Sequence, residues 1–356
     1  MTLGEQIIGF IEHLPVPEGK LVGQSLKLMD FQKRFILDVY DNPHGTKTAI
    51  LSMARKNGKT ALIAGLLLAH LVGPAAQLNS QIISGAMSRE QAGLVFKLAH
   101  KMVLQSAELS GIIKVIPSSK TLIGLPLNVE YKAIAADGST AQGLSPALVI
   151  FDEAGQVQGP QNDFYDALVT SQGAHDNPLM INISTQAPTD ADLLSVMIDD
   201  ARSGSDKRTV CHVYEAPADC DVGDRAAWEA ANPALGVFRS EQDMQDLAEK
   251  AKRLPSFSNT FRNLNLNQRI SSEAPFVSPE EWKACIADYN EEPFLKGEVW
   301  GGLDLSMKTD LTALGRIDIH LVSLADDQDQ ASAAPPLRIN PNPMGADRRS
   351  APRQGR

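Results

Sequence analysis

Cysteine is scarce in this sequence. There are three cysteines in 356 residues, Cys211, Cys220 and Cys285. None of their spacings matches the C-x-x-C pairs of zinc sites, and an odd number cannot form a complete set of disulfides. A disulfide framework and a structural zinc site are therefore not expected, and the composition fits a reducing compartment such as the cytoplasm.

The sequence also lacks a segment that would insert into a membrane. The N-terminus carries an early acidic residue, Glu5, and has neither the basic start nor the long apolar core of a signal peptide. The longest apolar stretch, 61–72, is interrupted by Gly65 and His70 and is too short to span a bilayer. No membrane partner is expected.

An excess of basic residues is absent as well. The chain has 33 Lys and Arg against 43 Asp and Glu, which gives a formal net charge of −10 at pH 7. Proteins that read DNA sequences usually carry a basic face, so this balance argues against a dedicated sequence-specific DNA reader. It leaves open a protein that grips DNA with a few local Lys and Arg side chains, because net charge says little about one patch.

What the sequence does contain is an alternation of apolar strand-like segments and amphipathic helical segments. Strands are predicted at 47–52, 81–85, 148–151 and 180–183, with helices at 58–72 and from 88 onward. This alternation predicts an α/β fold with a parallel sheet flanked by helices. Polar residues at the strand ends would meet at one edge of that sheet, where nucleotide sites lie.

The turn between the first predicted strand and its helix resembles a phosphate loop. Gly58, Lys59 and Thr60 fit the end of the pattern G-x-x-x-x-G-K-[ST], while Met53 occupies the position of the first glycine. In such loops backbone N–H groups bind phosphate oxygens, the lysine binds the β- and γ-phosphates, and the hydroxyl binds Mg²⁺. On this tripeptide alone, an ordinary strand–turn–helix with a surface lysine is an equally good explanation.

The predicted strand at 148–151 ends in two acids, Asp152 and Glu153. Charge at the end of a buried strand is unfavourable unless a ligand uses it. Asp152 is predicted to hold Mg²⁺ through water, and Glu153 to act as the general base that polarises the attacking water. A strand that simply exits into a polar turn is the weaker alternative, because the phosphate loop belongs to the same predicted sheet.

Two further signals are weak when taken alone. The strand at 180–183 ends in Ser184, Thr185 and Gln186, whose hydroxyl and amide groups can sense a γ-phosphate. Gln32 precedes the phosphate loop in the chain, and its amide can read the edge of adenine. Many strands end in Ser-Thr, and a solvent-facing glutamine on an amphipathic helix explains Gln32 equally well.

An arginine near the γ-phosphate accelerates related reactions by roughly 10³–10⁵-fold. Arg55, inside the loop, is the catalytic candidate within the chain. Arg89 and Arg202 are alternatives that would act in the same subunit or across a subunit interface. For these two, an ordinary surface arginine is the favoured explanation.

Taken together, these motifs resemble the large terminase subunit of tailed bacteriophages. The resemblance rests on the loop at 54–60, the motif Asp152-Glu-Ala-Gly155 and the strand end at 184–186. It continues through Trp228-Glu-Ala-Ala-Asn-Pro233, Leu264-Asn-Leu-Asn267, Gly302-Leu-Asp-Leu-Ser306 and Asp310-Leu-Thr-Ala313, and covers about residues 20 to 315.

By position in the family's motifs, the resemblance assigns roles to individual residues. Glu153 and Arg55 are implied as catalytic, Ser184, Thr185 and Gln186 as the coupling motif, and Asp304 as the first metal ligand of a nuclease. Thr60 and Asp152 are implied as ligands of the Mg²⁺ that accompanies ATP. The implied nucleotide-binding residues are Gln32, Arg55, Lys56, Asn57, Gly58, Lys59 and Thr60.

The resemblance also implies an activity and partners. It implies a RecA-like phosphate-loop ATPase that pumps viral double-stranded DNA into a procapsid through the portal protein, with ATP and Mg²⁺ as cofactors. It further implies a ribonuclease H-like nuclease that uses a divalent metal pair. It also implies a small terminase subunit as partner, a ring of five copies of the chain, and the cytoplasm of the bacterial host as location.

The predicted domain organisation follows from these motifs and from composition. The segments are a helical lead-in at 1–46, an ATPase domain at 47–216, a helical connector at 217–297, the start of a nuclease at 298–320 and a low-complexity tail at 321–356.

The predicted nuclease departs from the family pattern. A two-metal site needs several carboxylates that converge from separate strands. Asp304 and Asp310 precede the tail, whereas Asp318, Asp326 and Asp327 are not expected on core strands. A truncated or frame-shifted gene would produce such an end, and the nuclease is then expected to be incomplete and inactive.

Two other functions compete with the packaging motor. A helicase-type ATPase would need a second motor domain with its own arginine motif, for which the sequence shows no signal. A non-catalytic fragment that binds nucleotide or portal without turning over ATP is compatible with the composition.

Overall fold

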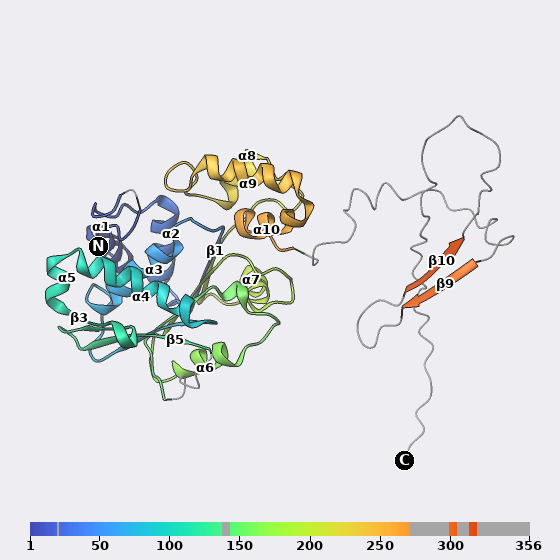
Figure 1. Ribbon diagram of the computed structural model, residues 1–356. Coiled ribbons are helices and arrows are strands. Elements are labelled where there is room, and N and C mark those ends of the chain that lie inside the picture. Colours follow the sequence, from blue (N-terminus) through green and yellow to red (C-terminus); the bar gives the residue numbers. More distant parts are fainter. Residues whose placement is uncertain (20, 137–142, 271–298, 305–312, 319–356) are drawn as a thin grey trace, which may run out of the picture. The chain divides into compact units, whose positions relative to one another are not determined.

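The computed structural model describes residues 1–19, 21–136, 143–270, 299–304 and 313–318 (Figure 1). The chain divides into two compact units, Met1–Ala274 and Pro275–Arg356. In the described part of the chain, no helix is long and apolar enough to cross a membrane.

The first unit is built on an eight-stranded sheet with the order β3-β4-β5-β2-β6-β7-β1-β8. All neighbouring strands from β5 to β8 pair in parallel, while β3 and β4 form an antiparallel edge. The predicted parallel α/β sheet is thereby confirmed. The strands are β1 (Thr48–Met53), β2 (Gln81–Ala86), β3 (Ile113–Ile116), β4 (Thr121–Gly124), β5 (Val129–Ala135), β6 (Leu148–Asp152), β7 (Leu179–Ser184) and β8 (Thr209–Tyr214).

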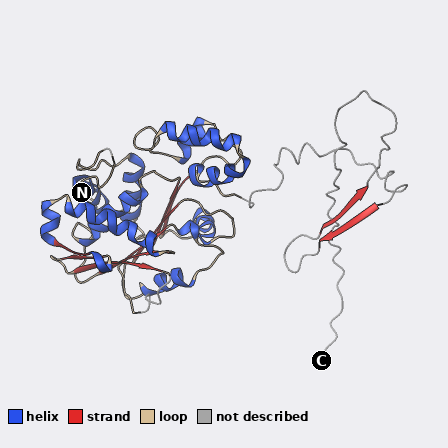
Figure 2. Cartoon of the chain, viewed as in Figure 1, coloured by secondary structure: helices blue, strands red, loops and turns tan. Residues whose placement is uncertain are grey.

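Helices cover both faces of this sheet, as Figure 2 shows. The α-helices are α1 (Leu3–His13), α2 (Asp30–Tyr40), α3 (Lys59–Leu71), α4 (Arg89–Leu104), α5 (Ala107–Ile112), α6 (Asp163–Ser171), α7 (Leu193–Ser203), α8 (Arg225–Ala231), α9 (Glu241–Arg253) and α10 (Pro255–Leu266). Short 3₁₀ turns lie at η1 (Pro117–Ser119) and η2 (Ala154–Gln156).

Alternate residues of each central strand point to opposite faces, so the sheet separates two apolar clusters. On β6, Leu148 and Ile150 belong to the cluster under α1 to α5, and Val149 and Phe151 to the cluster under α6 and α7. Central strands that are buried on both faces read as continuous apolar runs, which explains why they were predictable from sequence.

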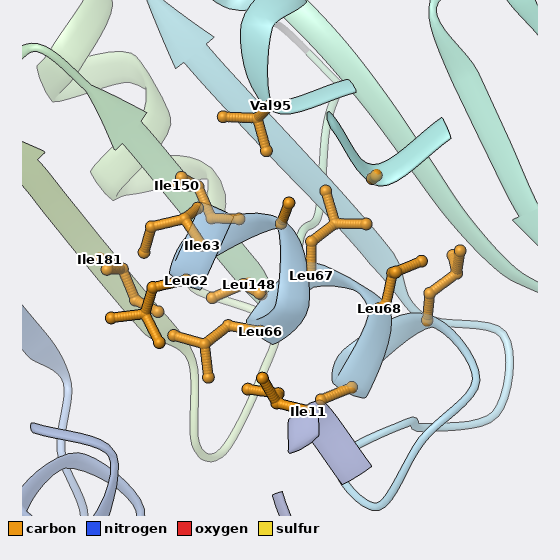
Figure 3. Packing of buried hydrophobic residues seen from close by; sticks show 14 of the residues in the cluster. Ile11, Leu62, Ile63, Leu66, Leu67, Leu68, Val95, Leu148, Ile150 and Ile181 are labelled. Carbon is orange, nitrogen blue, oxygen red and sulfur yellow. The ribbon is translucent and has the colours of Figure 1, made fainter. Parts of the chain in front are cut away.

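Helix α3 lies at the centre of the first cluster and carries the phosphate loop at its N-terminus. Leu62, Leu66 and their neighbours on this helix are buried around its whole circumference, against Leu148, Ile150 and Ile181 of the sheet (Figure 3). Helix α1 packs on its outer side. A helix buried on every side is held rigidly, so its N-terminus has a fixed position relative to the strand ends.

Helices α8, α9 and α10 form a separate small core within the same compact unit. Phe261 and Met244 are fully buried there, and the cluster extends to Ala54 of the phosphate loop and Ala216 beyond β8. The prediction of a helical connector at 217–297 agrees with these three helices, and its residues 271–297 lie outside the described residues. We call α8–α10 and the turns between them, residues 225–267, the connector.

The second unit contains a two-stranded antiparallel sheet of β9 (Val299–Asp304) and β10 (Ala313–Asp318). Both strands lie within the nuclease start predicted at 298–320, and Asp318, which was not expected on a core strand, is the last residue of β10. In the register, Asp304 is opposite Ala313 and Asp318 is opposite Val299. The two acids therefore stand at opposite ends of the hairpin. Asp310, Asp326 and Asp327 lie outside the described residues.

Candidate functional site

The phosphate loop connects the end of β1 with the start of α3. Two of its residues have left-handed backbone conformations, Lys56 with a φ of 66° and Gly58 with a φ of 78°. Glycine adopts this conformation without steric strain, which accounts for Gly58 directly before the helix. The first turn of α3 thus directs its unpaired N–H groups toward the space above the loop, as anion binding requires.

Lys59 is buried at the first position of α3, with 8% of its surface exposed. Its ammonium donates to the carbonyl oxygens of Met53 at 2.5 Å and Ala54 at 3.1 Å. Burial lowers the pKa of Lys59 to about 8, although the charges of Glu153 and Asp152 partly oppose this shift. The third proton of the ammonium is left for an anion in the loop.

The acidic pair lies at the end of β6, between β2 and β7. Asp152 is 3% exposed, and burial together with the charge of Glu153 raises its pKa to about 7. Lys59 acts in the opposite direction and lowers that pKa. The structure therefore brings Lys59, Asp152 and Glu153 into electrostatic contact, as the predicted sheet edge required.

Glu153 has a left-handed backbone conformation, with a φ of 58°. Its N–H donates to the carbonyl of Ile183 at 2.8 Å, and its carboxylate accepts a hydrogen bond from the Ser184 hydroxyl at 3.2 Å. The N–H of Gly155 donates to the same hydroxyl oxygen at 2.8 Å. A hydrogen bond thus joins Glu153, the predicted general base, to Ser184 of the predicted coupling motif.

Gly155 permits this contact because it has no side chain. A Cβ at this position would lie 2.3 Å from the carbonyl oxygen of Thr185 and 2.8 Å from the Ser184 hydroxyl. Contacts this short with backbone do not occur in folded proteins. The glycine in the Asp152-Glu-Ala-Gly155 motif is therefore explained by the close approach of β7.

Gln186, the last residue of the coupling motif, is hydrogen-bonded to the connector and to Glu215, which follows β8. The N–H of Gln186 donates to the side-chain oxygen of Asn267 at 2.7 Å, and its carbonyl accepts from the Asn263 amide at 2.9 Å. Its side-chain amide donates to Glu215 at 2.8 Å. These hydrogen bonds link the end of β7 to α10.

The side chain of Asn57 is hydrogen-bonded to the phosphate loop and to the connector. Its amide donates to the carbonyls of Ala54 at 3.1 Å and Arg55 at 3.3 Å and to the side chain of Asn232 at 2.9 Å. Its oxygen accepts from the N–H of Ala234 at 3.1 Å. These bonds hold the loop against the connector and leave only the backbone N–H of Asn57 for the predicted nucleotide contact.

Two of the predicted loop residues, Arg55 and Lys56, are exposed. Lys56 forms an exposed ion pair with Asp243 of α9 at 3.3 Å. The N–H of Arg55 donates to the carbonyl of Leu264 at 2.9 Å, whereas its side chain is exposed and near enough to Lys59 to lower the pKa of that lysine. The two positive charges of Arg55 and Lys59 repel each other, and an anion bound between them would offset this repulsion.

The two alternative arginines have other surroundings. Arg202, on α7, forms an ion pair with Glu215 at 2.5 Å, and Glu215 also receives the hydrogen bond from Gln186. Arg89 is the first residue of α4, and its carbonyl accepts from Lys120 at 2.7 Å. Arg202 is thus joined to the coupling motif through one carboxylate, a link that the sequence did not suggest.

Gln32 lies on α2 and is close to the phosphate loop. It is 5% exposed, and its Oε1 accepts from the N–H of Met29 at 3.0 Å. Its Nε2 lies 3.7 Å from the point where a Cβ of Gly58 would stand. The glutamine is therefore beside the loop rather than on a solvent-facing surface.

The donor set suits a magnesium ion bound together with phosphates. Mg²⁺ prefers one or two carboxylates, a hydroxyl and water, completed by phosphate oxygens. Asp152 and Thr60 supply such oxygens, and an ion there would favour the charged form of a carboxyl that is otherwise held near neutrality by burial. Within the described residues, no cluster of three or more His, Cys, Asp and Glu side chains indicates a separate metal site.

Sequence reasoning gave the connector asparagines no individual role, although Asn232, Asn265 and Asn267 lie within motifs on which the resemblance is based. Asn232, Asn263, Asn265 and Asn267 are all at least nine-tenths buried, and each is hydrogen-bonded to the site or to another of them. Their signal in the sequence is an asparagine repeat in a region that also contains the Trp228 and Leu264 motifs. Buried amides of this density are retained for specific hydrogen bonds.

Comparison with known proteins agrees with this geometry. A family model for the ATPase domain of the terminase large subunit matches residues 30–203, and one for its endonuclease domain matches residues 205–319. The endonuclease match begins ahead of the predicted nuclease start at 298. Its first part includes β8 and the connector, which pack in the first compact unit.

Individual relatives give the same result. The terminase large subunit of Enterobacteria phage HK97 is 62% identical over 316 residues, which are 88% of this chain and 62% of the relative. That of Lactococcus phage p2 is 24% identical over 275 residues, 74% of this chain and 49% of the relative. The crystal structure of the HK97 large terminase superposes with a TM-score of 0.73 at 60% identity and covers 89% of this chain and 65% of that one.

The chain spans less than two thirds of the length of these relatives. The similarity nonetheless extends over both family models and almost nine-tenths of the present sequence. The residues matched by the two family models, 30–203 and 205–319, include the positions of all the motifs on which the resemblance was based. The chain belongs to the terminase large subunit family.

Proposed function

We propose that the first unit binds ATP with Mg²⁺ in the phosphate loop and hydrolyses it. The observation that supports this most directly is the buried Lys59, held by loop carbonyls and facing Asp152 and Glu153. Burial lowers the pKa of Lys59 to about 8, and the negative charge of a bound polyphosphate would favour the protonated ammonium.

Each proposed role follows from the chemistry of the group. Lys59 binds the β- and γ-phosphates, and Thr60 and Asp152 hold the metal ion, which neutralises charge on the phosphates. Glu153 orients and deprotonates the attacking water, and its bond to Ser184 reports the state of the γ-phosphate to the coupling motif. Arg55, exposed at the loop, stabilises the charge that develops on the transferred phosphoryl group.

Steady-state ATP hydrolysis by the full chain tests this proposal. Glu153→Gln is expected to lower kcat by at least about 100-fold, as loss of a general base does, and to leave ATP affinity within about three-fold. Glu130→Gln, which changes an exposed carboxylate on β5 of the same sheet, serves as the matched control and should retain full turnover. Equal turnover by parent and Glu153→Gln would show that the site is not the catalytic one.

We further propose that the protein uses this hydrolysis to move double-stranded DNA into a procapsid. The proposal rests on membership in the terminase large subunit family. The proposed partners are the portal protein, the small terminase subunit and further copies of this chain in a five-membered ring. The proposed location is the cytoplasm of the bacterial host. DNA protected from nuclease after mixing with procapsids, ATP and the chain would support this function. ATP binding without turnover, with or without DNA, would favour the non-catalytic alternative.

We propose that the second unit has no nuclease activity in this chain. A two-metal nuclease site needs carboxylates that converge, whereas the register sets Asp304 and Asp318 at opposite ends of the described hairpin. Five residue steps along a strand separate them by about 17 Å. We expect the chain by itself not to nick supercoiled plasmid in Mg²⁺ or Mn²⁺, and nicking that is abolished by Asp304→Asn would contradict this.

A further inference from the structure

A tight turn between α8 and α9 brings an aromatic side chain to the phosphate loop. In this turn the carbonyl oxygen of Ala234 accepts from the N–H groups of Val237, Phe238 and Arg239 at 3.1, 3.3 and 3.1 Å. Gly236, with a φ of 78°, closes the turn through a 2.9 Å bond from its N–H to the Arg239 carbonyl. Phe238 is thus carried on a short, hydrogen-bonded support.

The turn is anchored on both sides. The Arg239 side chain is 2% exposed, and its guanidinium donates to Asn265 at 3.2 Å and pairs with Asp243. The N–H of Ala234 donates to the side chain of Asn57 in the phosphate loop at 3.1 Å. Because the support is bonded directly to the loop, the position of Phe238 relative to the loop is fixed by the fold.

Phe238 and Gln32 approach Gly58 from separate elements. From the point where a Cβ of Gly58 would stand, Cε2 and Cζ of the Phe238 ring are each 3.1 Å away and Nε2 of Gln32 is 3.7 Å away. Phe238 remains 46% exposed. In the described part of the chain, Nε2 of Gln32 has no hydrogen-bond acceptor, while its Oε1 keeps one lone pair beyond the bond from Met29.

A single exposed phenylalanine is common on protein surfaces and has no meaning alone. Here, however, a partly exposed ring, an amide with an unused donor and acceptor, and a phosphate loop with a buried lysine meet around one glycine. A flat apolar surface and a paired donor and acceptor are what a purine base requires, since its face stacks on aromatic rings and its edge forms paired hydrogen bonds.

We propose that Phe238 stacks on the base of a purine nucleotide bound in the phosphate loop, next to the Gln32 amide that the family resemblance already assigns to the edge of the base. This inference rests on the proposed binding of a nucleoside triphosphate at Lys59. Stacking is available to any base, so Phe238 contributes affinity without selecting the base. The Gln32 amide donates to N7 and accepts from the N6 amino group of adenine, and this second bond is not available with guanine.

The test measures the binding of three ligands to the full chain by calorimetry: Mg·ATP, Mg·GTP and magnesium tripolyphosphate, which has no base. Phe238→Ala should weaken ATP and GTP by a similar factor of about ten and leave tripolyphosphate within about two-fold. Phe238→Trp should preserve the affinity for both nucleotides. Val237→Ala is the matched control, since this neighbour is 68% exposed and is expected to leave all three affinities unchanged.

Gln32→Ala provides the contrasting result. It should reduce the preference for ATP over GTP, whereas Phe238→Ala should keep that ratio constant. Unchanged nucleotide affinity in Phe238→Ala would overturn the inference while the proposed ATP site stands. An increased nucleotide affinity in Phe238→Ala would also overturn it, because it would show that the ring blocks the site. An equal loss of affinity for nucleotides and for tripolyphosphate would overturn it too, because it would show that Phe238 acts on the phosphate loop and not on the base. A parent chain that binds neither ATP nor tripolyphosphate would overturn the proposed function as well.

Discussion

Replacing Asn57 by alanine would separate the phosphate loop from the connector. The side chain is 1% exposed and has four hydrogen bonds, to Ala54, Arg55, Asn232 and Ala234. Two of these close the loop on itself, and two cross to the turn after α8. Asn57→Ala removes all four without introducing a steric clash.

The expected loss of stability can be worked out from these contacts. A hydrogen bond within a protein contributes about 1 kcal/mol, and a buried partner left unsatisfied costs about 1–3 kcal/mol. The side-chain oxygen of Asn232 and the N–H of Ala234 would both lose their partner in a buried environment. We therefore expect Asn57→Ala to lower the free energy of unfolding by about 3–5 kcal/mol, a large part of the 5–15 kcal/mol typical of a domain.

Urea unfolding followed by circular dichroism measures this loss. Asn177→Ala removes an exposed amide and should change the free energy of unfolding by less than about 0.5 kcal/mol. Asn57→Ala combined with Asn232→Ala should cost less than the sum of the two single substitutions, because either one already breaks the shared bond. A loss below about 1 kcal/mol for Asn57→Ala, or strict additivity, would refute this account of the loop.

Two other predictions concern the acidic strand end. Gly155→Ala would place a Cβ 2.3 Å from the Thr185 carbonyl, so we expect about 3 kcal/mol of destabilisation and a loss of ATP turnover. Gly111→Ala, in helix α5 with open space around it, should instead be neutral or stabilising, and a thermal shift assay separates the two; equal melting temperatures would contradict the contact. The pKa of Asp152 in the folded protein, about 7, lies above its ordinary value of 3.8, so its contribution to stability is present below pH 4 and is lost as the pH rises through 7. Without ligand, Asp152→Asn should therefore be more stable than the parent at pH 8, by up to about 4 kcal/mol, and this gap should close toward pH 4. If urea unfolding gives the same difference in free energy of unfolding between Asp152→Asn and the parent at pH 4 and at pH 8, the ionised Asp152 carboxylate does not destabilise the fold and this reasoning is wrong.

The central strands and helices of the fold were predictable because burial dictates their composition. Strands β1, β2, β6 and β7 are covered on both faces, so each is a short and mainly apolar run, and β6 and β7 end in the polar residues Asp152 and Ser184. The edge strands β3 and β4 have four residues each and a mixed pattern, which carries little periodic signal. Helix α10 has a weak apolar periodicity for a different reason: its buried positions include the asparagines Asn263 and Asn265.

The site was predictable only to the level of its motifs. Lys59, Asp152, Glu153 and Ser184 lie at strand ends or helix starts, and the topology of a parallel sheet brings such positions together. The connector contacts depend on the tertiary path of residues 225–267, for which no local pattern exists. The individual roles proposed for the site residues, and the domain boundaries proposed from sequence, remain predictions that the experiments above address.

The position of Asn267 has a practical consequence for dissecting this protein. From the end of α10 its amide reaches Ser52 on β1, the N–H of Gln186 and the carbonyl of Tyr214 on β8. A recombinant fragment that stops after β8 would lose this three-way junction and uncover the apolar surface around Ala54. The shortest soluble ATPase fragment should therefore extend through Asn267, and a protease that trims the native chain should spare every peptide bond from β1 to the end of α10 except those in exposed loops.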